Sequence, residues 1–210
     1  GTAAISTLFF ATLTPGDHVV AFDDLYAGTR RMLESLFRDR LAVDVSFVDA
    51  TDTDNVADAM RPETELLYME TPTNPLLRLC DLAAIADVAE AGDAAFAVDN
   101  TFCSPALQNP LELGADIVAH STTKYLNGHS DSIGGALVLD DDDLAEECYH
   151  LQRVLLGNAM APFDAYMTLR GTKTLPMRMR QHEASAREIA AFLDDHPLVE
   201  AVHYPGLESH

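Results

Sequence analysis

A single lysine in a polar loop is the residue of this sequence best suited to covalent chemistry. Of the 13 Lys and Arg residues only Lys124 and Lys173 are lysines, so arginine supplies nearly every positive charge. A guanidinium stays protonated, whereas a lysine amine can lose its proton and condense with a carbonyl group. Lys124 follows the hydroxyl-bearing run 121–123, and no acidic residue lies between Asp116 and Asp131 to pair with it. We therefore predict that Lys124 forms an imine, the alternative being a solvated loop lysine.

Other polar residues follow predicted strands in the same way. Asp99 ends the apolar run 94–98, and Glu70 and Asn74 follow the run 66–69. Ligands of open α/β sheets bind beyond the carboxyl ends of the strands. We therefore expect these residues and the Lys124 loop to meet in one pocket, although Asp99 taken alone could equally be a turn or helix-cap residue.

This combination of residue types predicts a cofactor. An imine-forming lysine, a carboxylate that can pair with a protonated ring nitrogen, and hydroxyls suited to a phosphate together describe pyridoxal 5'-phosphate. Lys124 would hold it as an internal aldimine and shuttle protons, while Asp99 would keep the pyridine nitrogen protonated. Ser121 and Thr123, with backbone amides at the start of a helix opened by Gly1-Thr2, would cradle the phosphate.

The elements that must position these residues alternate along the chain. Apolar runs predict strands at residues 18–22, 43–48, 66–69, 94–98, just before Lys124, and 135–139, with helices at 3–13, 29–39, 53–60 and 81–92 between them. This alternation predicts a largely parallel sheet with helices on its faces. After the acidic run 140–143, which we expect to cap a helix, the pattern is mainly helical, with one long helix at 175–195. A further strand is expected to begin at Val199.

The composition limits the classes of partner. The chain carries 34 Asp and Glu, and its net charge is −21. This acidity argues against nucleic acids and anionic membranes, since both attract basic patches. The 48% hydrophobic content is too high for a disordered chain, and an acidic folded surface resembles those of proteins adapted to high salt. A length of 210 residues favours one large α/β domain, although it also accommodates two small ones.

The cysteines and the chain's first residue bear on location. Cys80, Cys103 and Cys148 show no CxxC or Cys/His spacing, so we expect reduced, unligated thiols and a cytoplasmic protein. We find no signal peptide and no apolar span of about 18 residues. The sequence begins at Gly1 without an initiator methionine, so a leader could have been lost.

Other kinds of site are less well supported. The sequence lacks G-x-G-x-x-G after the first strand and G-x-x-x-x-G-K-[ST], which counts against dinucleotide-binding and P-loop folds. His120, His129 and Asp131 do not have the spacing of a common metal site, so no metal is expected. Cys103 has no neighbouring His or cation to activate it as a nucleophile.

Several stretches together carry a family resemblance: Val-Asp-Asn-Thr-Phe at 98–102, Pro-Leu-Glu-Leu-Gly-Ala-Asp at 110–116, His-Ser-Thr-Thr-Lys-Tyr-Leu-Asn-Gly-His-Ser-Asp at 120–131, Phe-Asp-Ala-Tyr at 163–166 and Leu-Arg-Gly-Thr-Lys-Thr at 169–174. Over essentially all 210 residues the sequence resembles the Cys/Met-metabolism pyridoxal-phosphate-dependent enzymes. That family includes cystathionine γ-synthase, γ-lyase and β-lyase, methionine γ-lyase and O-acetylhomoserine sulfhydrylase. The resemblance implies an α/β, aspartate-aminotransferase-like (fold type I) large domain, with a mostly parallel seven-stranded sheet and helices on both faces.

The resemblance also implies roles for individual residues. Lys124 matches the Schiff-base lysine and Asp99 the partner of the pyridinium. The phosphate ligands would be Ser121, Thr123, Gly1 and Thr2. Tyr26 matches the tyrosine that stacks on the cofactor ring and assists proton transfer, Asn74 an asparagine near the cofactor's phenolic oxygen and the substrate, and Arg31 a substrate-contacting arginine. Where the family has Tyr-Gly-Gly, residues 26–28 of this sequence are Tyr-Ala-Gly. A small residue still follows the tyrosine, which supports the match of Tyr26 more than the match of Arg31.

The family pattern extends beyond this sequence at both ends. An N-terminal arm reaching a neighbouring subunit would precede Gly1, and a C-terminal domain with a carboxylate-binding arginine would follow His210. We therefore expect residues 1–160 to form the core of the cofactor-binding domain and 161–210 a helical continuation toward that C-terminal domain. The resemblance implies a homodimer or homotetramer and a cystathionine γ-synthase or γ-lyase activity. The other family activities are alternatives, and a non-catalytic remnant of the fold is an alternative of a different class.

Overall fold

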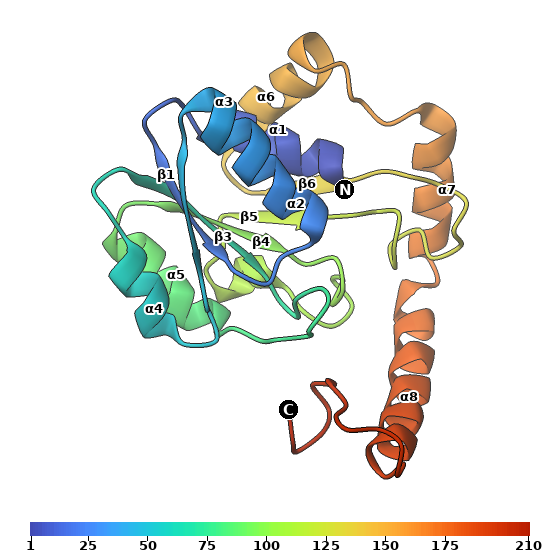
Figure 1. The fold of residues 1–210 in the computed structure, drawn as a ribbon. Helices are drawn as coiled ribbons and strands as arrows, with labels where there is room; N and C mark the ends of the chain where they lie inside the picture. The colour runs from blue at the N-terminus through green and yellow to red at the C-terminus, as the bar shows by residue number, and fades with distance from the viewer.

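The computed structural model describes residues 1–210 and contains one six-stranded sheet in the order β2-β1-β3-β4-β5-β6 (Figure 1). The strands are β1 (His18–Phe22), β2 (Asp44–Val48), β3 (Thr64–Glu70), β4 (Ala95–Asp99), β5 (Ile117–His120) and β6 (Ala136–Leu139). Neighbouring strands from β2 to β5 are parallel, and only β6 runs antiparallel to its neighbour. The predicted mostly parallel α/β fold is confirmed.

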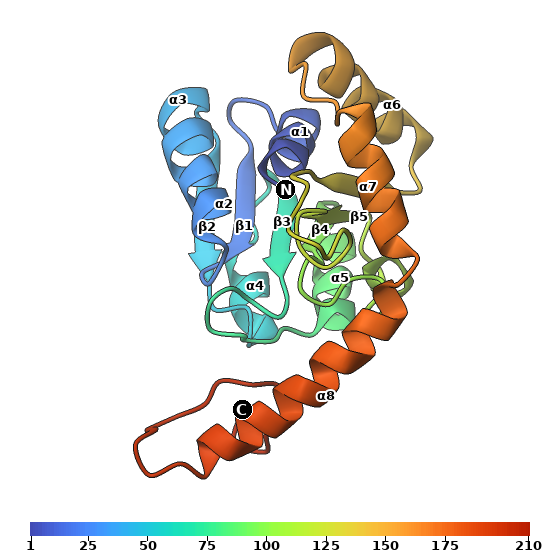
Figure 2. The same ribbon diagram turned by 90° about the vertical axis from the view of Figure 1, so that its right-hand side faces the viewer.

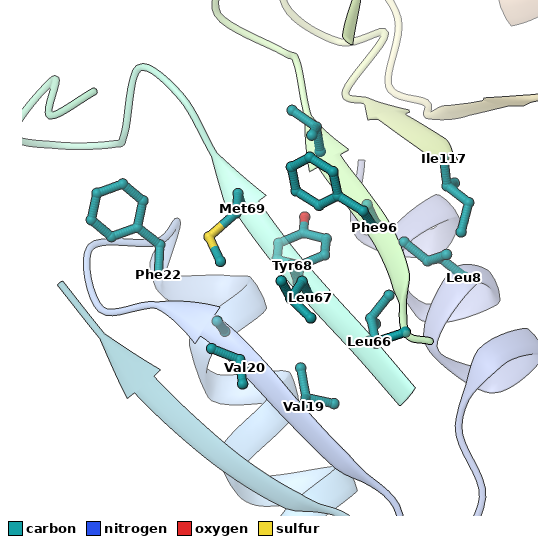
Figure 3. Packing of buried hydrophobic residues seen from close by; sticks show 14 of the residues in the cluster. Leu8, Val19, Val20, Phe22, Leu66, Leu67, Tyr68, Met69, Phe96 and Ile117 are labelled. Carbon is teal, nitrogen blue, oxygen red and sulfur yellow. The ribbon is translucent and has the colours of Figure 1, made fainter. Parts of the chain in front are cut away.

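The central strands are the most deeply buried part of the chain. All five residues of β1 and all four of β5 are buried, as expected for parallel strands covered on both faces. On β3, Leu67 and Met69 alternate with Tyr68 and Glu70, so the two pairs face opposite sides of the sheet. Figure 3 shows Leu67, Tyr68 and Met69 among their neighbours in a core of 28 buried residues. This packing fixes the strand register and therefore where each strand ends.

Helices cover both faces of the sheet (Figure 1). On one side lie α1 (Thr2–Thr12) and a helical run made of α2 (Ala27–Met32), a π-helical segment (Leu33–Arg38) and α3 (Asp39–Leu41). On the other side lie α4 (Thr53–Ala59) and α5 (Leu82–Ala91). The predicted caps form: the Asp81 carboxylate accepts hydrogen bonds from the amides of Ala83 and Ala84 at the start of α5, each at 3.1 Å. Asp141 likewise accepts from the amide of Leu144.

The last third of the chain is helical. It comprises α6 (Asp142–His150), a π-helical segment (Leu151–Leu155), α7 (Pro162–Thr172) and α8 (Leu175–Asp194). Figure 2 shows α8 continuing past the strands and away from the sheet, so that only its first turns lie near the Lys124 loop. The long helix predicted at 175–195 is confirmed. No helix of the chain has both the length and the apolar character needed to cross a membrane.

This chain contributes six strands, where the resemblance implies seven for the whole large domain. One expectation about strands is wrong, because the segment that begins at Val199 forms no strand. The physical reason is the lack of a pairing partner, because a strand needs a neighbour for its backbone N–H and C=O groups. This segment follows α8, which has already carried the chain beyond the sheet.

Candidate active site

The predicted residues meet at the carboxyl edge of the parallel strands, where one open cleft of about 960 Å³ lies. It is lined by Gly1, Thr2, Tyr26, Asn74, Asp99, Ser121, Thr123 and Lys124, which are all of the predicted cofactor ligands. Glu70 and Thr101 also line it. The structure therefore brings together residues from five separate stretches of the chain, which lie up to 123 positions apart in the sequence.

Asp99 is the last residue of β4 and is only 7% exposed. Its carboxylate accepts the Thr101 amide at 3.1 Å and the Tyr68 hydroxyl at 3.3 Å. Burial raises the pKa of Asp99, and the hydrogen bonds from Thr101 and Tyr68 act in the opposite direction. Asp99 takes part in none of the six side-chain ion pairs. A buried carboxylate without a cation, facing a cleft, is suited to a positively charged ring.

Thr101 connects Asp99 to the loop that carries the lysine. Its hydroxyl donates to the Asp99 carboxylate and accepts the amide of Ser121 at 2.8 Å. The positions of the ring-facing carboxylate and of the lysine loop are therefore coupled through one side chain. Sequence analysis did not assign a role to Thr101, and its only signal was its place two residues after Asp99.

Glu70 is a second buried carboxyl group beside Asp99. It ends β3, is paired with Asp99 in the register of β3 and β4, and is 2% exposed. Its Oε2 accepts the amide of Tyr26 at 3.0 Å, whereas Oε1 is buried with no hydrogen-bond partner. Burial, followed by the nearby charge of Asp99, raises the pKa of Glu70 to about 8. Glu70 therefore holds Tyr26 at the cleft and is largely protonated at neutral pH.

The lysine loop lies against the start of α1. The Thr123 hydroxyl accepts the amide of Gly134 at 3.0 Å, and the carbonyl of Gly134 accepts from the backbone nitrogen of Gly1. A Cβ added to Gly1 would lie 2.9 Å from the Ser121 Oγ, so the Ser121 side chain packs directly against the glycine. Hydroxyls and amides at a helix N-terminus form a ready site for a phosphate. Lys124 is exposed to the cleft beside them.

The two remaining predicted ligands lie on loops over the cleft. Tyr26 immediately precedes α2 and is 46% exposed, and Asn74 lies in the turn after β3. The Thr73 hydroxyl donates to Asp24, which ties the two loops together. Arg31 is exposed on α2 and does not line the cleft, so the structure does not place it with the other predicted residues.

The alternative sites do not gain partners in the fold. No three or more His, Cys, Asp and Glu side chains are grouped so that they could hold a metal ion. Burial lowers the pKa of His120 to about 4 and raises that of the Cys103 thiol to about 11. Cys103 is therefore protonated at neutral pH.

The set of groups around the cleft fits pyridoxal 5'-phosphate. It contains an amine for the aldehyde, an unpaired buried carboxylate for the ring nitrogen, and hydroxyls packed against a helix N-terminus for the phosphate. Each of these matches one functional group of the cofactor.

Comparison with known proteins points the same way. The family model for Cys/Met metabolism PLP-dependent enzymes matches residues 1–210. The chain is 52% identical over 210 residues to cystathionine gamma-synthase of Mycobacterium tuberculosis and 48% identical over 211 residues to cystathionine beta-lyase of Coxiella burnetii, covering all of this chain and 54% of each relative. It superimposes with a TM-score of 0.96 and 42% identity on cystathionine gamma-lyase of Lactobacillus plantarum, solved with L-serine, covering 100% of this chain and 54% of that one. The chain thus spans about half the length of the curated relatives it matches.

Proposed function

This chain belongs to the Cys/Met metabolism PLP-dependent enzyme family, and from that premise we propose that it forms the cofactor-binding part of a carbon–sulfur lyase or γ-replacement transferase. The observation that carries the proposal is that Lys124, Asp99 and the phosphate-site residues line one cleft. The solved cystathionine gamma-lyase supports the same assignment, because a TM-score of 0.96 shows that it shares this arrangement of strands and helices.

Each residue then has a role that its surroundings support. Bound pyridoxal 5'-phosphate supplies an electron sink for the carbanion formed at the substrate Cα. Lys124 binds the cofactor's aldehyde and moves the Cα proton, since it is the one lysine in the cleft lining. Asp99 keeps the ring nitrogen protonated. The phosphate is bound by the hydroxyls of Ser121 and Thr123 and the amides of Gly1 and Thr2.

Tyr26 and Asn74 complete the cleft from the loop side. By family resemblance Tyr26 would stack on the cofactor ring and assist proton transfer. The hydrogen bond from its amide to Glu70 holds its backbone at the cleft. Asn74 lies near the cofactor's phenolic oxygen and the substrate. We retain Arg31 as a substrate-contacting residue on family resemblance alone, since it does not line the cleft in this chain.

The substrate we propose is a sulfur amino acid or an activated homoserine, with cystathionine γ-synthase or γ-lyase chemistry as the leading activity. Methionine γ-lyase, cystathionine β-lyase and O-acetylhomoserine sulfhydrylase are the alternatives. Relatives with a synthase, a β-lyase and a γ-lyase name all match this stretch at 42–52% identity, so identity here does not separate these activities. The residues that line the cleft serve the step common to all of them.

Partners, location and domain organisation are also proposals. We propose a homodimer or homotetramer in the cytoplasm of a cell with high internal salt, without nucleic-acid or membrane partners. Three free thiols and a net charge of −21 support the location and the salt adaptation. We further propose that residues 1–160 form the domain core and that 161–210 lead toward a C-terminal domain, as the extended course of α8 suggests.

Assays of the enzyme with three substrate sets would test the proposal. Turnover of cystathionine alone indicates a lyase, condensation of an O-acyl-homoserine with cysteine indicates the synthase, and thiol release from methionine indicates methionine γ-lyase. Visible cofactor absorbance should accompany any of these. A well-folded protein with no cofactor absorbance and no turnover would instead support the non-catalytic remnant.

A further inference from the structure

The guanidinium of Arg178, on the first turn of α8, binds three backbone carbonyls next to the lysine loop. Its Nη1 donates to the carbonyl of Tyr125 at 2.8 Å, and its Nη2 donates to those of Gly171 at 2.9 Å and Leu126 at 3.4 Å. Its Nε donates to the Thr174 hydroxyl at 3.1 Å. One side chain therefore joins α8, the end of α7 and the residues directly after Lys124.

The carbonyl of Gly171 also accepts the amide and the hydroxyl of Thr174, whereas those of Tyr125 and Leu126 accept from Arg178 alone. The Lys124 amide donates to the carbonyl of Ser121 at 3.2 Å, and the Lys124 carbonyl accepts the amide of Gly128 at 2.7 Å. The next two carbonyls, of Tyr125 and Leu126, extend beyond this turn and would lack protein partners without Arg178. A guanidinium is suited to this task because its planar, rigid fork of N–H donors can serve several acceptors at once.

Arg178 forms no ion pair, although the chain contains 34 acidic residues. Its guanidinium donates to three carbonyls and the Thr174 hydroxyl. The carbonyl of Gly171 lies in the last turn of α7, where a cation is favourable. Burial lowers the pKa of Arg178 below the usual range for arginine. In such an acidic chain, an arginine that binds carbonyls and no carboxylate indicates that these carbonyls need a hydrogen-bond donor.

Two glycines allow Arg178 and the lysine loop to approach closely. A Cβ on Gly128, whose φ is +76°, would lie 2.0 Å from the Arg178 Nη1, and a Cβ on Gly171 would lie 2.1 Å from the Asn127 carbonyl. The ring of His182, one helical turn after Arg178, lies 5.5 Å from that of Tyr125. The lysine loop is thus in contact with α7 and α8 at several points, with Arg178 at the centre.

We propose that Arg178 is a positioning residue that fixes the Lys124 loop, so that α8 sets the place of the reactive amine in the cleft. The inference rests on the proposed function, because it concerns the same lysine. Arg178 does not line the cleft and so would not touch substrate or cofactor. Its effect is expected on the rate of proton transfer by Lys124, where a displacement of about 1 Å can reduce a rate roughly a hundredfold.

Three variants of the whole enzyme test this. Arg178→Met removes the donors and retains most of the apolar stem. Arg178→Lys retains the charge but loses the fork. Arg180→Met, two residues along α8 at an exposed position without hydrogen bonds, is the matched control. The readouts are kcat, KM, and the extent of borohydride-fixed cofactor on the peptide that contains Lys124.

We expect Arg178→Met to lower kcat by roughly ten- to a hundredfold while KM changes by less than about threefold. Arg178→Lys should be intermediate, because one ammonium cannot reach carbonyls on both sides. In Arg178→Ala, millimolar methylguanidinium should restore part of kcat, whereas methylammonium should not. Such rescue would not occur if the variant had lost activity by unfolding.

Other results would overturn the inference. Kinetics of Arg178→Met equal to those of Arg180→Met would show that the carbonyl contacts do not position the lysine. If Arg178→Met does not fold, a fully active Arg178→Lys would lead to the same conclusion. Absence of borohydride-fixed cofactor at Lys124 in the unmodified enzyme would instead contradict the proposed function, so the two failures can be told apart.

Discussion

At the scale of single residues, the chemistry assigned to the cleft depends on one amine and two carboxyl groups with different surroundings. Asp99 receives hydrogen bonds from Thr101 and Tyr68, whereas one oxygen of Glu70 has no partner. Two buried carboxyl groups on paired strand positions cannot both ionise at low cost, because each destabilises the charge of the other. Asp99 is therefore the group suited to remain charged beside a ring cation.

The first prediction concerns Lys124. Lys124→Ala should remove the visible absorbance of the bound cofactor and lower turnover by roughly a thousandfold or more, because no other lysine lines the cleft. Lys173→Ala, which removes the only other lysine, is the control and should be near wild type. Unchanged absorbance and rate in Lys124→Ala would contradict the assignment.

The second prediction concerns Asp99. Asp99→Asn keeps the shape of the side chain but cannot stabilise a pyridinium as a charge, so we expect weaker cofactor retention and Cα deprotonation slowed roughly a hundredfold. Single-turnover kinetics and dialysis against buffer without cofactor would measure the two effects. A near-normal single-turnover rate would count against the role of Asp99.

The third prediction concerns the pH dependence caused by Glu70. Its pKa of about 8 in the folded chain exceeds the usual 4.5, so between these values the folded state binds a proton that the unfolded state has released. This contribution to stability is fully present below about pH 4.5, decreases as the pH rises toward 8, and is lost above it. In Glu70→Gln this loss is absent.

We therefore expect Glu70→Gln to gain stability relative to the wild type as the pH rises from 5 to 8, by at most a few kcal/mol, at about 1.4 kcal/mol per pKa unit. Denaturant unfolding of the cofactor-free protein measures the difference. Glu65→Gln, an exposed position on the same strand, is the control. A constant difference across this pH range would show that Glu70 is ionised throughout.

At the scale of the elements, the strands and helices could be predicted because their signals are local. Strand β1 is a histidine followed by four apolar residues, and α5 begins after an Asp and ends at a Gly, as helices commonly do. The π-helical segment Leu33–Arg38 could not be predicted, since its hydrogen bonding depends on packing against the sheet rather than on composition. The segment after Val199 has strand-like residues but no partner strand, and a single sequence does not show the partner.

Those residues of the site that follow the ends of strands could be predicted from the sequence. Asp99 and the Lys124 loop were found in this way, because the end of a parallel strand fixes where the next residues lie. Thr101, the unpartnered oxygen of Glu70 and the contacts of Arg178 depend on side-chain geometry between distant segments. Arg178 lies 54 residues after Lys124, and only the fold brings the two segments together.

The prediction at this scale concerns the cap of α5, the helix that covers one face of the sheet. Asp81→Ala removes an acceptor used by two orphan amides, so we expect a loss of about 1 kcal/mol in the free energy of unfolding. Asp87→Ala on the exposed side of the same helix should change it by less than about 0.5 kcal/mol. Equal effects of the two substitutions, measured by urea unfolding, would mean that the cap contributes nothing beyond its charge.

At the scale of the whole molecule, charge is the dominant feature. Six of the 34 acidic residues form ion pairs, at distances up to 3.5 Å, and these pairs lie at the surface. The other carboxylates have no cation beside them, and a net charge of −21 makes the compact state repel itself. Surface ion pairs contribute only about 0–1 kcal/mol each, so the few present cannot offset this repulsion.

The last prediction follows from how salt screens that repulsion. The Debye length falls from about 10 Å at 0.1 M salt to about 3 Å at 1 M, which is shorter than the spacing of most surface carboxylates. The cofactor-bound enzyme should therefore have a melting temperature that rises by several degrees between 0.1 and 2 M potassium chloride. Measuring the same series in sorbitol at matched osmolality separates screening from general solute exclusion. Because screening weakens the few ion pairs as well, a flat or falling melting temperature would mean that those pairs outweigh the repulsion, and it would contradict the proposed adaptation to high salt.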